Sequence, residues 1–154
     1  MIKKILDAIA NTTDLYYRLV LLVDTGNDHI GLAGELSEHL GTEVVNVNYE
    51  LSKQLLHQTA RQRKLHLSKS LAEIVQHDKV VLLDHIEILF DVELGQDPLR
   101  LLELLSRNQT VIAFWSGRIK DGKLIYAEQG HPEYRSYAVK DVTVIEIDKE
   151  KGEI

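Results

Sequence analysis

The sequence predicts an α/β protein built on a mainly parallel sheet of five strands. Continuous apolar runs, typical of strands that are buried on both faces, recur along the chain. Segments with apolar residues at helical spacing lie between them, and this alternation favours parallel strands joined by right-handed crossovers. The expected strands are residues 19–23, 44–48, 80–83, 110–115 and 142–147.

Length, composition and charge narrow the class of protein. The chain has 154 residues, of which 44% are hydrophobic and 27% charged, so we expect one globular domain over residues 1–154. The net charge of −6 provides no general attraction to nucleic acid or to an anionic membrane. Cysteine is absent, which excludes disulfides, thiolate metal sites and a cysteine nucleophile and is consistent with a cytoplasmic protein. No apolar run is long enough to span a bilayer, so we expect no membrane partner.

A short helix and two tyrosines precede the first strand. Helical spacing predicts an N-terminal helix whose buried face carries Ile2, Ile5, Leu6 and Ile9. Tyr16 and Tyr17 then lead into the strand. They could stack on the base of a nucleotide, or they could pack the N-terminal helix onto the sheet, which the usual burial of aromatic rings favours.

A polar loop and a helix follow the first strand. Residues 24–29 are polar, and the helix that follows is predicted by the spacing of Leu32, Leu36 and Leu40 and by Gly41 at its end. A buried strand, a tight polar loop and a helix form the frame in which a phosphate-binding loop normally occurs.

The residues of this loop do not meet the chemical requirements of that motif. The pattern G-x-x-x-x-G-K-[ST] needs glycines that let backbone N–H groups approach phosphates, a lysine for the outer phosphates and a hydroxyl for Mg²⁺. Aligned with residues 23–30, the four required positions hold Val23, Asp28, His29 and Ile30. The carboxylates of Asp24 and Asp28 would also repel a triphosphate. The candidate nucleotide-binding residues of the loop, functional or vestigial, are Gly26, Asn27 and His29.

The second strand leads into a basic region. Asn48 could cap a helix that begins near Tyr49, and another helix is expected to begin near Leu67. If one helix continued between them, it would carry a basic stripe made of Lys53, His57, Arg61 and Lys64. The region could contact the phosphates of a nucleic acid, or it could form a solvated helix face, which the acidic net charge favours. The nucleic-acid candidates are Arg61, Arg63 and Lys64.

The third strand ends in a carboxylate. Residues 80–83 are apolar and Asp84 follows them. Asp84 would therefore lie at the carboxyl end of its strand, and ligands of open parallel sheets bind at this end of the strands. In a P-loop NTPase such an aspartate holds Mg²⁺, and a nearby glutamate can polarise the attacking water. Asp84 is therefore the candidate magnesium ligand and Glu87 the candidate catalytic residue. A second interpretation is a metal site without nucleotide, since carboxylates and imidazole suit divalent ions; its candidates are Asp24, Asp28, His29, Asp84 and Glu87.

The rest of the chain is expected to complete the sheet. Asp97 followed by proline predicts the start of a helix. The strand at residues 110–115 ends at Ser116, which either senses the terminal phosphate of a nucleotide or forms a turn. A small hairpin is expected within residues 119–127, because the dipeptide Asp-Gly is a strong turn signal. A polar loop at residues 130–135 then precedes the last strand.

Six segments together resemble a known protein family. Residues 81–87 read VLLDHIE, residues 96–102 read QDPLRLL, and residues 126–135, the most specific of the six, read YAEQGHPEYR. The other three are residues 15–23, 45–48 and 105–111. Over nearly its whole length, the chain resembles the BrxF family, the small P-loop-containing component of type 3 BREX (bacteriophage exclusion) systems of bacteria.

The resemblance carries expectations about fold and partners. It implies a P-loop NTPase-like fold of the AAA-related kind, a three-layer sandwich whose five-stranded sheet has the order 5-1-4-3-2. It implies a cytoplasmic role in phage defence beside a larger ATPase, a methyltransferase and a phosphatase-like protein. The sequence assigns no cofactor; ATP and Mg²⁺ are the candidates. Many members carry Lys-Thr in the loop, whereas this chain has His29 and Ile30. We expect no room for a helical lid after residues 142–147.

Three hypotheses about function follow. The leading one is a non-catalytic, ATPase-like subunit that binds other BREX proteins, especially the larger ATPase, or further copies of itself. The alternative is a functional NTPase, an ATP hydrolase that could need a partner chain to supply the missing lysine. The third is a nucleic-acid-binding accessory module that uses the basic region.

Overall fold

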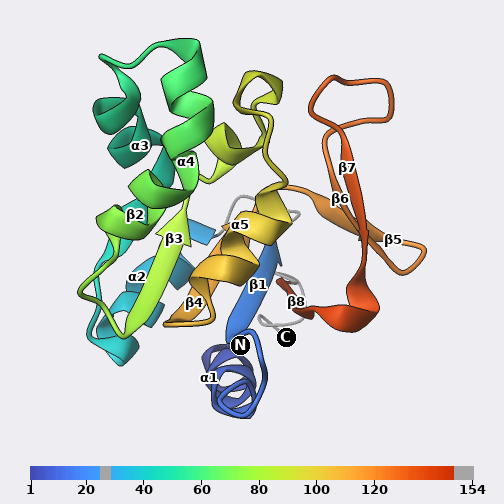
Figure 1. Ribbon diagram of the computed structural model, residues 1–154. Helices are drawn as coiled ribbons and strands as arrows, with labels where there is room; N and C mark the ends of the chain where they lie inside the picture. Colours follow the sequence, from blue (N-terminus) through green and yellow to red (C-terminus); the bar gives the residue numbers. More distant parts are fainter. Residues whose placement is uncertain (25–28, 148–154) are drawn as a thin grey trace.

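The main sheet has five parallel strands covered by helices on both faces, which confirms the predicted α/β class (Figure 1). The computed structural model describes residues 1–24 and 29–147. Across the sheet the strands lie in the order β2-β3-β4-β1-β8. Their bounds are β1 Leu19–Asp24, β2 Val44–Asn46, β3 Val80–Asp84, β4 Thr110–Trp115 and β8 Thr143–Ile147. None of the described helices is long and apolar enough to cross a membrane.

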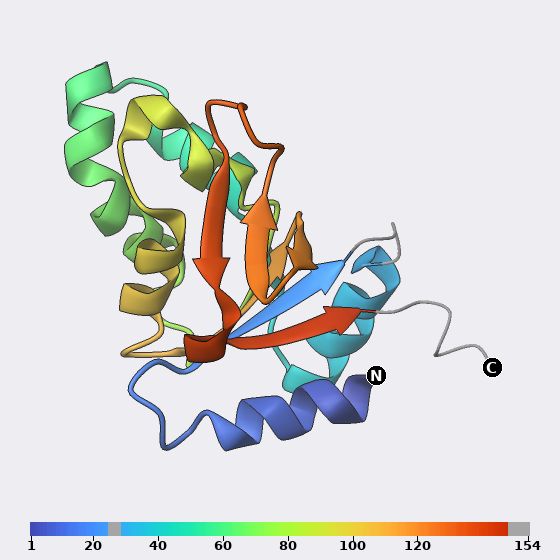
Figure 2. The same ribbon diagram turned by 90° about the vertical axis from the view of Figure 1, so that its right-hand side faces the viewer.

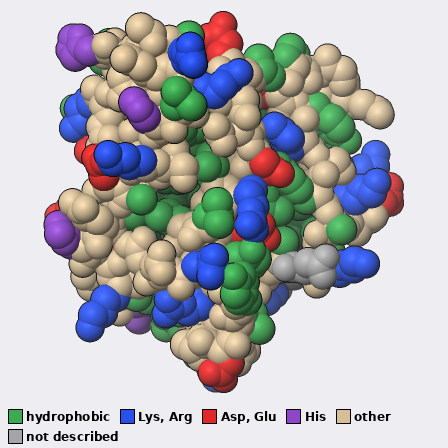
Figure 3. Space-filling view, in the orientation of Figure 1, with side chains coloured by type: hydrophobic (Ala, Val, Ile, Leu, Met, Phe, Trp, Pro, Cys, Tyr) green, Lys and Arg blue, Asp and Glu red, His purple; other side chains and the backbone are tan. Residues whose placement is uncertain are grey.

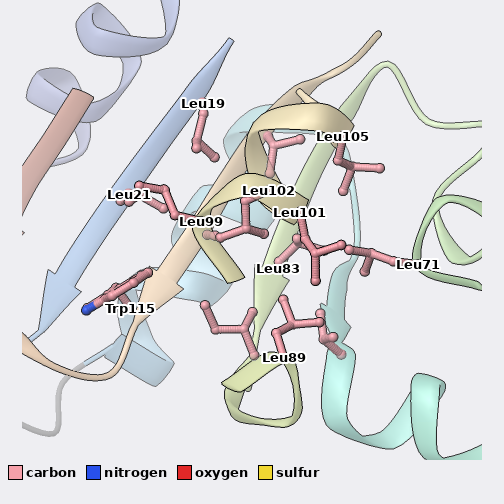
Figure 4. Packing of buried hydrophobic residues seen from close by; sticks show 14 of the residues in the cluster. Leu19, Leu21, Leu71, Leu83, Leu89, Leu99, Leu101, Leu102, Leu105 and Trp115 are labelled. Carbon is pink, nitrogen blue, oxygen red and sulfur yellow. The ribbon is translucent and has the colours of Figure 1, made fainter. Parts of the chain in front are cut away.

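Alternate residues of the central strands pack into two separate hydrophobic cores, one on each face of the sheet. In β1, Val20 and Leu22 pack toward α1 (Ile2–Asn11) and α2 (His29–Leu40). Leu19, Leu21 and Val23 belong to the larger cluster beneath α3 (Val47–Leu55), α4 (Ala60–Ile74) and α5 (Pro98–Leu105). Figure 2 separates these two helical layers, and Figure 4 shows the larger cluster, in which Leu99 and Leu102 of α5 lie between Leu21 of β1 and Leu83 of β3. The continuous apolar runs therefore reflect burial on both faces.

Helix α3 begins earlier than predicted, and its cap is Asn46 rather than Asn48. β2 is only three residues long, and the side chain of Asn46 accepts a hydrogen bond of 3.0 Å from the backbone N–H of Tyr49. Asn48 instead contacts the segment after β3, where its Oδ1 accepts the N–H of Ile88 at 2.7 Å.

The predicted basic stripe does not form, because residues 56–59 separate α3 from α4. Helix α4 begins at Ala60, seven residues before the predicted start near Leu67. Thr59 and Gln62 form a reciprocal capping box at this start. The T-x-x-Q signal was present in the sequence, and it explains why a new helix begins there.

Two short 3₁₀ helices, η1 (Glu87–Phe90) and η2 (Val92–Leu94), fill the connection between β3 and α5. The predicted start of α5 is confirmed: Asp97 caps it by accepting the backbone N–H groups of Leu99 and Arg100. Tyr17 lies near this helix, and its hydroxyl accepts a hydrogen bond of 2.6 Å from Nη1 of Arg100.

The two tyrosines occupy neither of the positions considered from the sequence. They precede β1, whereas the polar loop follows it, so they lie at the opposite end of the strand. Arg107 lies 4.6 Å over the ring of Tyr16, and Tyr17 contacts α5 through Arg100. They therefore secure the start of β1 to α5 and the turn after it.

A second, antiparallel sheet stands beside the main one and contains the predicted hairpin plus one strand that was not predicted. Asp121 and Gly122 both have positive φ, as the tight turn between β5 (Arg118–Lys120) and β6 (Lys123–Tyr126) requires. The third strand, β7 (Arg135–Ala138), pairs with β6 and is followed by η3 (Val139–Asp141). The start of β7 falls within the stretch that was expected to be a loop. The strand forms there because long-range contacts stabilise it, such as the hydrogen bond of 2.7 Å that the hydroxyl of Tyr137 donates to Asp97.

Burial of two tyrosines in this second sheet predicts a loss of stability at high pH. Burial, with smaller contributions from Glu133 and Glu87, raises the pKa of Tyr126 to about 12; burial and the hydrogen bond to Asp97 also raise the pKa of Tyr137. An unfolded tyrosine ionises near pH 10, so above that pH the unfolded chain loses protons first and the free energy of unfolding falls. Thermal melts between pH 9 and 12 should show this fall. It should be shallower for Tyr126→Phe, and an identical slope in the two proteins would contradict the assignment.

Candidate functional site

The candidate site lies where parallel strands of the main sheet end. Asp24 is the last residue of β1 and Asp84 the last residue of β3. β4 lies between these strands, so the two carboxylates approach from either side of it. Helix α2 begins at His29 in the same region, and the ring of His29 lies 5.4 Å from the ring of Phe114 in β4. The sheet topology thus brings Asp84 close to His29 and Asp24, which lie 55 and 60 positions before it in the chain.

The side chain of His29 bridges the two carboxylates. Its Nδ1 lies 3.3 Å from Oδ2 of Asp24, and its Nε2 lies 3.4 Å from Oδ1 of Asp84. The backbone N–H of His29 also donates to the same Asp24 oxygen at 3.0 Å. Only 25% of the His29 side chain and 13% or less of either carboxylate side chain are exposed. Backbone and ring contacts together hold this imidazole in the space between β1 and β3.

A second imidazole, that of His85, completes the cluster. His85 has φ of +52°, a left-handed conformation that is uncommon outside glycine, and its N–H donates to Asp84 at 2.8 Å. The turned backbone places its Nε2 3.7 Å from Oδ2 of Asp84 and its Nδ1 3.6 Å from Oε1 of Glu87. The centroids of the two imidazole rings are 6.2 Å apart. The cluster is therefore a chain in which imidazoles and carboxylates alternate.

Asn48 secures the outer end of this chain. Besides accepting the N–H of Ile88, it approaches Oε1 of Glu87 with its Nδ2 at 3.5 Å, and its own N–H donates to the carbonyl of His85 at 2.8 Å. Oε2 of Glu87 is a buried atom that has no hydrogen-bond partner among the described residues. Asn48 therefore fixes the backbone that orients both His85 and Glu87.

The structure brings some of the predicted site residues together and leaves others apart. His29 and Asp84 are in direct contact, and Glu87 joins them through His85. Gly26, Asn27 and Asp28 lie outside the described residues. Ser116 follows β4 at the same edge of the sheet and is exposed. Sequence reasoning did not assign His85 or Asn48 to the site, although His85 directly follows Asp84.

Two of the three basic candidates are engaged with neighbouring structural elements. Arg63 donates from Nε to the carbonyl of Leu55 at 3.0 Å and from Nη2 to that of Leu56 at 3.4 Å. The side chain of Lys64 lies so close to Gly95 that a Cβ at that glycine would be 2.8 Å from Cε of Lys64. On the face drawn in Figure 3, Lys and Arg side chains are spread out between uncharged areas rather than gathered in one patch. Arg61 is exposed, and nucleic-acid binding through this region stays a prediction.

Comparisons with protein-family models, with curated proteins and with solved structures find no match to this chain. Three carboxylates and two imidazoles can exchange protons or bind a metal ion. Carboxylates surround the His29 ring on two sides, so the centre of the cluster is occupied by the protein's own side chains.

Proposed function

We propose that this chain is a non-catalytic, ATPase-like subunit of a BREX phage-defence system, and that it acts by binding other proteins of that system. The observation that carries the proposal is the position of His29. At the place in the loop–helix frame where a P-loop lysine would extend toward phosphates, its shorter side chain bridges Asp24 and Asp84. A side chain held in this way is not available to grip a nucleotide.

The sheet topology supports a P-loop NTPase-like fold. Numbered along the chain, the five strands read 5-1-4-3-2 from β8 to β2, which is the order that the resemblance to the BrxF family implies. The polar loop follows β1, the carboxylate of Asp84 ends β3, and Ser116 follows β4 between them. These are the positions that the phosphate loop, the magnesium ligand and the phosphate-sensing residue would have in such a fold.

The residues at these positions support the absence of catalysis. Ile30 follows His29, at the position where a P-loop has the hydroxyl that binds Mg²⁺. The side chain of Ile30 is 74% exposed and has no oxygen to bind the ion. The carboxylate of Asp24 opposes a triphosphate by roughly 1 to 4 kcal/mol per charge pair at 4 Å, depending on the local dielectric. The fold would then be kept for its surface, through which the larger BREX ATPase is the expected partner.

Isothermal calorimetry with Mg-ATP tests the proposal. We expect no measurable heat of binding at submillimolar nucleotide, because the cation and the hydroxyl that such a site requires are missing. A functional P-loop ATPase measured in the same buffer serves as the positive control. Tight, Mg-dependent binding would overturn the proposal.

The alternative function, ATP hydrolysis completed by a partner, makes a different prediction. Turnover would appear when the chain is mixed with the larger BREX ATPase, beyond the turnover of that ATPase alone, and it would be lost on Asp84→Ala. We expect instead that the two proteins co-purify and that Asp84→Ala leaves the turnover of the mixture unchanged. Failure to co-purify would contradict the partner assignment.

A further inference from the structure

The cluster at the carboxyl ends of β1 and β3 has the composition of a transition-metal site. His29, Asp84 and His85 each offer one ligand atom, and these three atoms all lie within 4.8 Å of one another. We propose that these three residues bind a divalent transition-metal ion, with Zn²⁺ as the expected metal. The inference goes beyond the proposed function and does not depend on it, because it uses neither a nucleotide nor a partner protein.

The distances fit ligands that share one small ion. Two ligands bound about 2.0–2.2 Å from zinc at tetrahedral angles are about 3.3–3.6 Å apart. Nε2 of His29 lies 3.4 Å from Oδ1 of Asp84, and Nε2 of His85 lies 3.7 Å from Oδ2 of the same residue. The first distance falls in this range and the second lies just above it. Rotation of the Asp84 carboxylate would let one oxygen serve between the two imidazoles, and the three ligand atoms, now within 4.8 Å of one another, would close around the ion.

Both imidazoles have the surroundings that metal-binding histidines usually have. Such a histidine binds the ion through one ring nitrogen and donates its other N–H to a carboxylate, which fixes the tautomer and the ring orientation. Here Nδ1 of His29 faces Asp24 at 3.3 Å, and Nδ1 of His85 faces Glu87 at 3.6 Å. If each imidazole only formed an ion pair with Asp84, no further carboxylate would be needed at its other ring nitrogen. The presence of such a carboxylate beside both rings therefore favours a metal site.

The ligand types select the metal. Imidazole nitrogen suits zinc and its neighbours in the first transition row, whereas Mg²⁺ prefers oxygen ligands and near-ideal octahedral geometry. Three protein ligands would leave at least one position for water or for a side chain of a partner. Because the ligands come from the start of α2 and from the end of β3, the ion would link these two elements across the region that a nucleotide would need.

The test uses the untagged 154-residue chain, stripped of metal with a chelator and titrated with ZnCl₂ in a calorimeter. We expect one ion per chain, and an absorption spectrum typical of tetrahedral coordination when Co²⁺ replaces Zn²⁺. Affinity should fall at least tenfold in His85→Gln and in Asp84→Asn. It should stay unchanged in His66→Gln, because His66 is an exposed histidine on α4. Lower pH should weaken binding, because protons compete for the imidazole nitrogens.

Circular dichroism of each metal-free variant shows whether it is folded. Asp84→Asn keeps the shape of the original side chain, so it still provides the test if His85→Gln does not fold. Absence of Zn²⁺ binding would overturn the proposal. Binding that is equally strong in His85→Gln, Asp84→Asn and wild type would place the ion at other residues and would overturn it as well. Saturation by Mg²⁺ at the same concentration would contradict the proposed ligand set.

Discussion

Gly117→Ala should destabilise the protein by about 2–4 kcal/mol, because the backbone leaves no space for a methyl group there. A Cβ at Gly117 would lie 1.9 Å from the carbonyl oxygen of Ile125 and 2.7 Å from Nε1 of Trp115. These two atoms form a hydrogen bond of 3.1 Å that joins the end of β4 to the second sheet. The substitution must move β6 and break this bond. Urea unfolding followed by the fluorescence of Trp115, the one tryptophan of the chain, measures the loss.

Gly34→Ala is the matched control. Gly34 lies within α2, and a Cβ there meets nothing within 4 Å. Because glycine inside a helix costs about 0.5–1 kcal/mol relative to alanine, this substitution should leave stability unchanged or increase it slightly. Equal effects of the two substitutions would show that the protein can accommodate a methyl group at Gly117.

Leu102→Ala should destabilise the protein by about 3 kcal/mol. Leu102 lies on α5, is 0% exposed and belongs to the larger core cluster between α5 and the sheet (Figure 4). Truncation removes apolar surface from the core and leaves a cavity that well-packed neighbours fill only in part. Denaturant unfolding monitored by circular dichroism gives the change in the free energy of unfolding.

Leu104→Ala on the same helix provides the comparison. Leu104 is 37% exposed, so the same chemical change removes less buried surface and should cost less than about 1.5 kcal/mol. Similar losses for the two variants would mean that helix propensity, and not burial against the sheet, accounts for the effect of Leu102→Ala.

The strands of the main sheet could be predicted because burial on both faces leaves a strong local pattern. The apolar runs that precede Asp24 and Asp84 are confirmed as β1 and β3, and the turn at Asp121 and Gly122 is confirmed by their positive φ values. β7 was missed because long-range contacts stabilise it: Arg135 donates to the carbonyl of Gln96 at 2.9 Å, and Tyr137 donates to Asp97. No local periodicity records such contacts.

The site was predicted in part for a similar reason. Polar residues at the ends of parallel strands are expected to meet at one edge of a sheet, and His29 and Asp84 do meet there. His85 was missed because its side chain turns back toward Asp84 only through a left-handed backbone conformation. A single histidine gives no sequence signal for that conformation, whereas a glycine would have suggested it.

We propose that the protein's own side chains fill the position that a nucleotide's phosphates would take in a P-loop fold. A crystal structure determined after soaking with Mg-ATP tests it most directly. We expect His29 to stay between Asp24 and Asp84, with no triphosphate beside it. Electron density for a triphosphate against the start of α2, with Mg²⁺ at Asp84 and the His29 ring displaced, would contradict it.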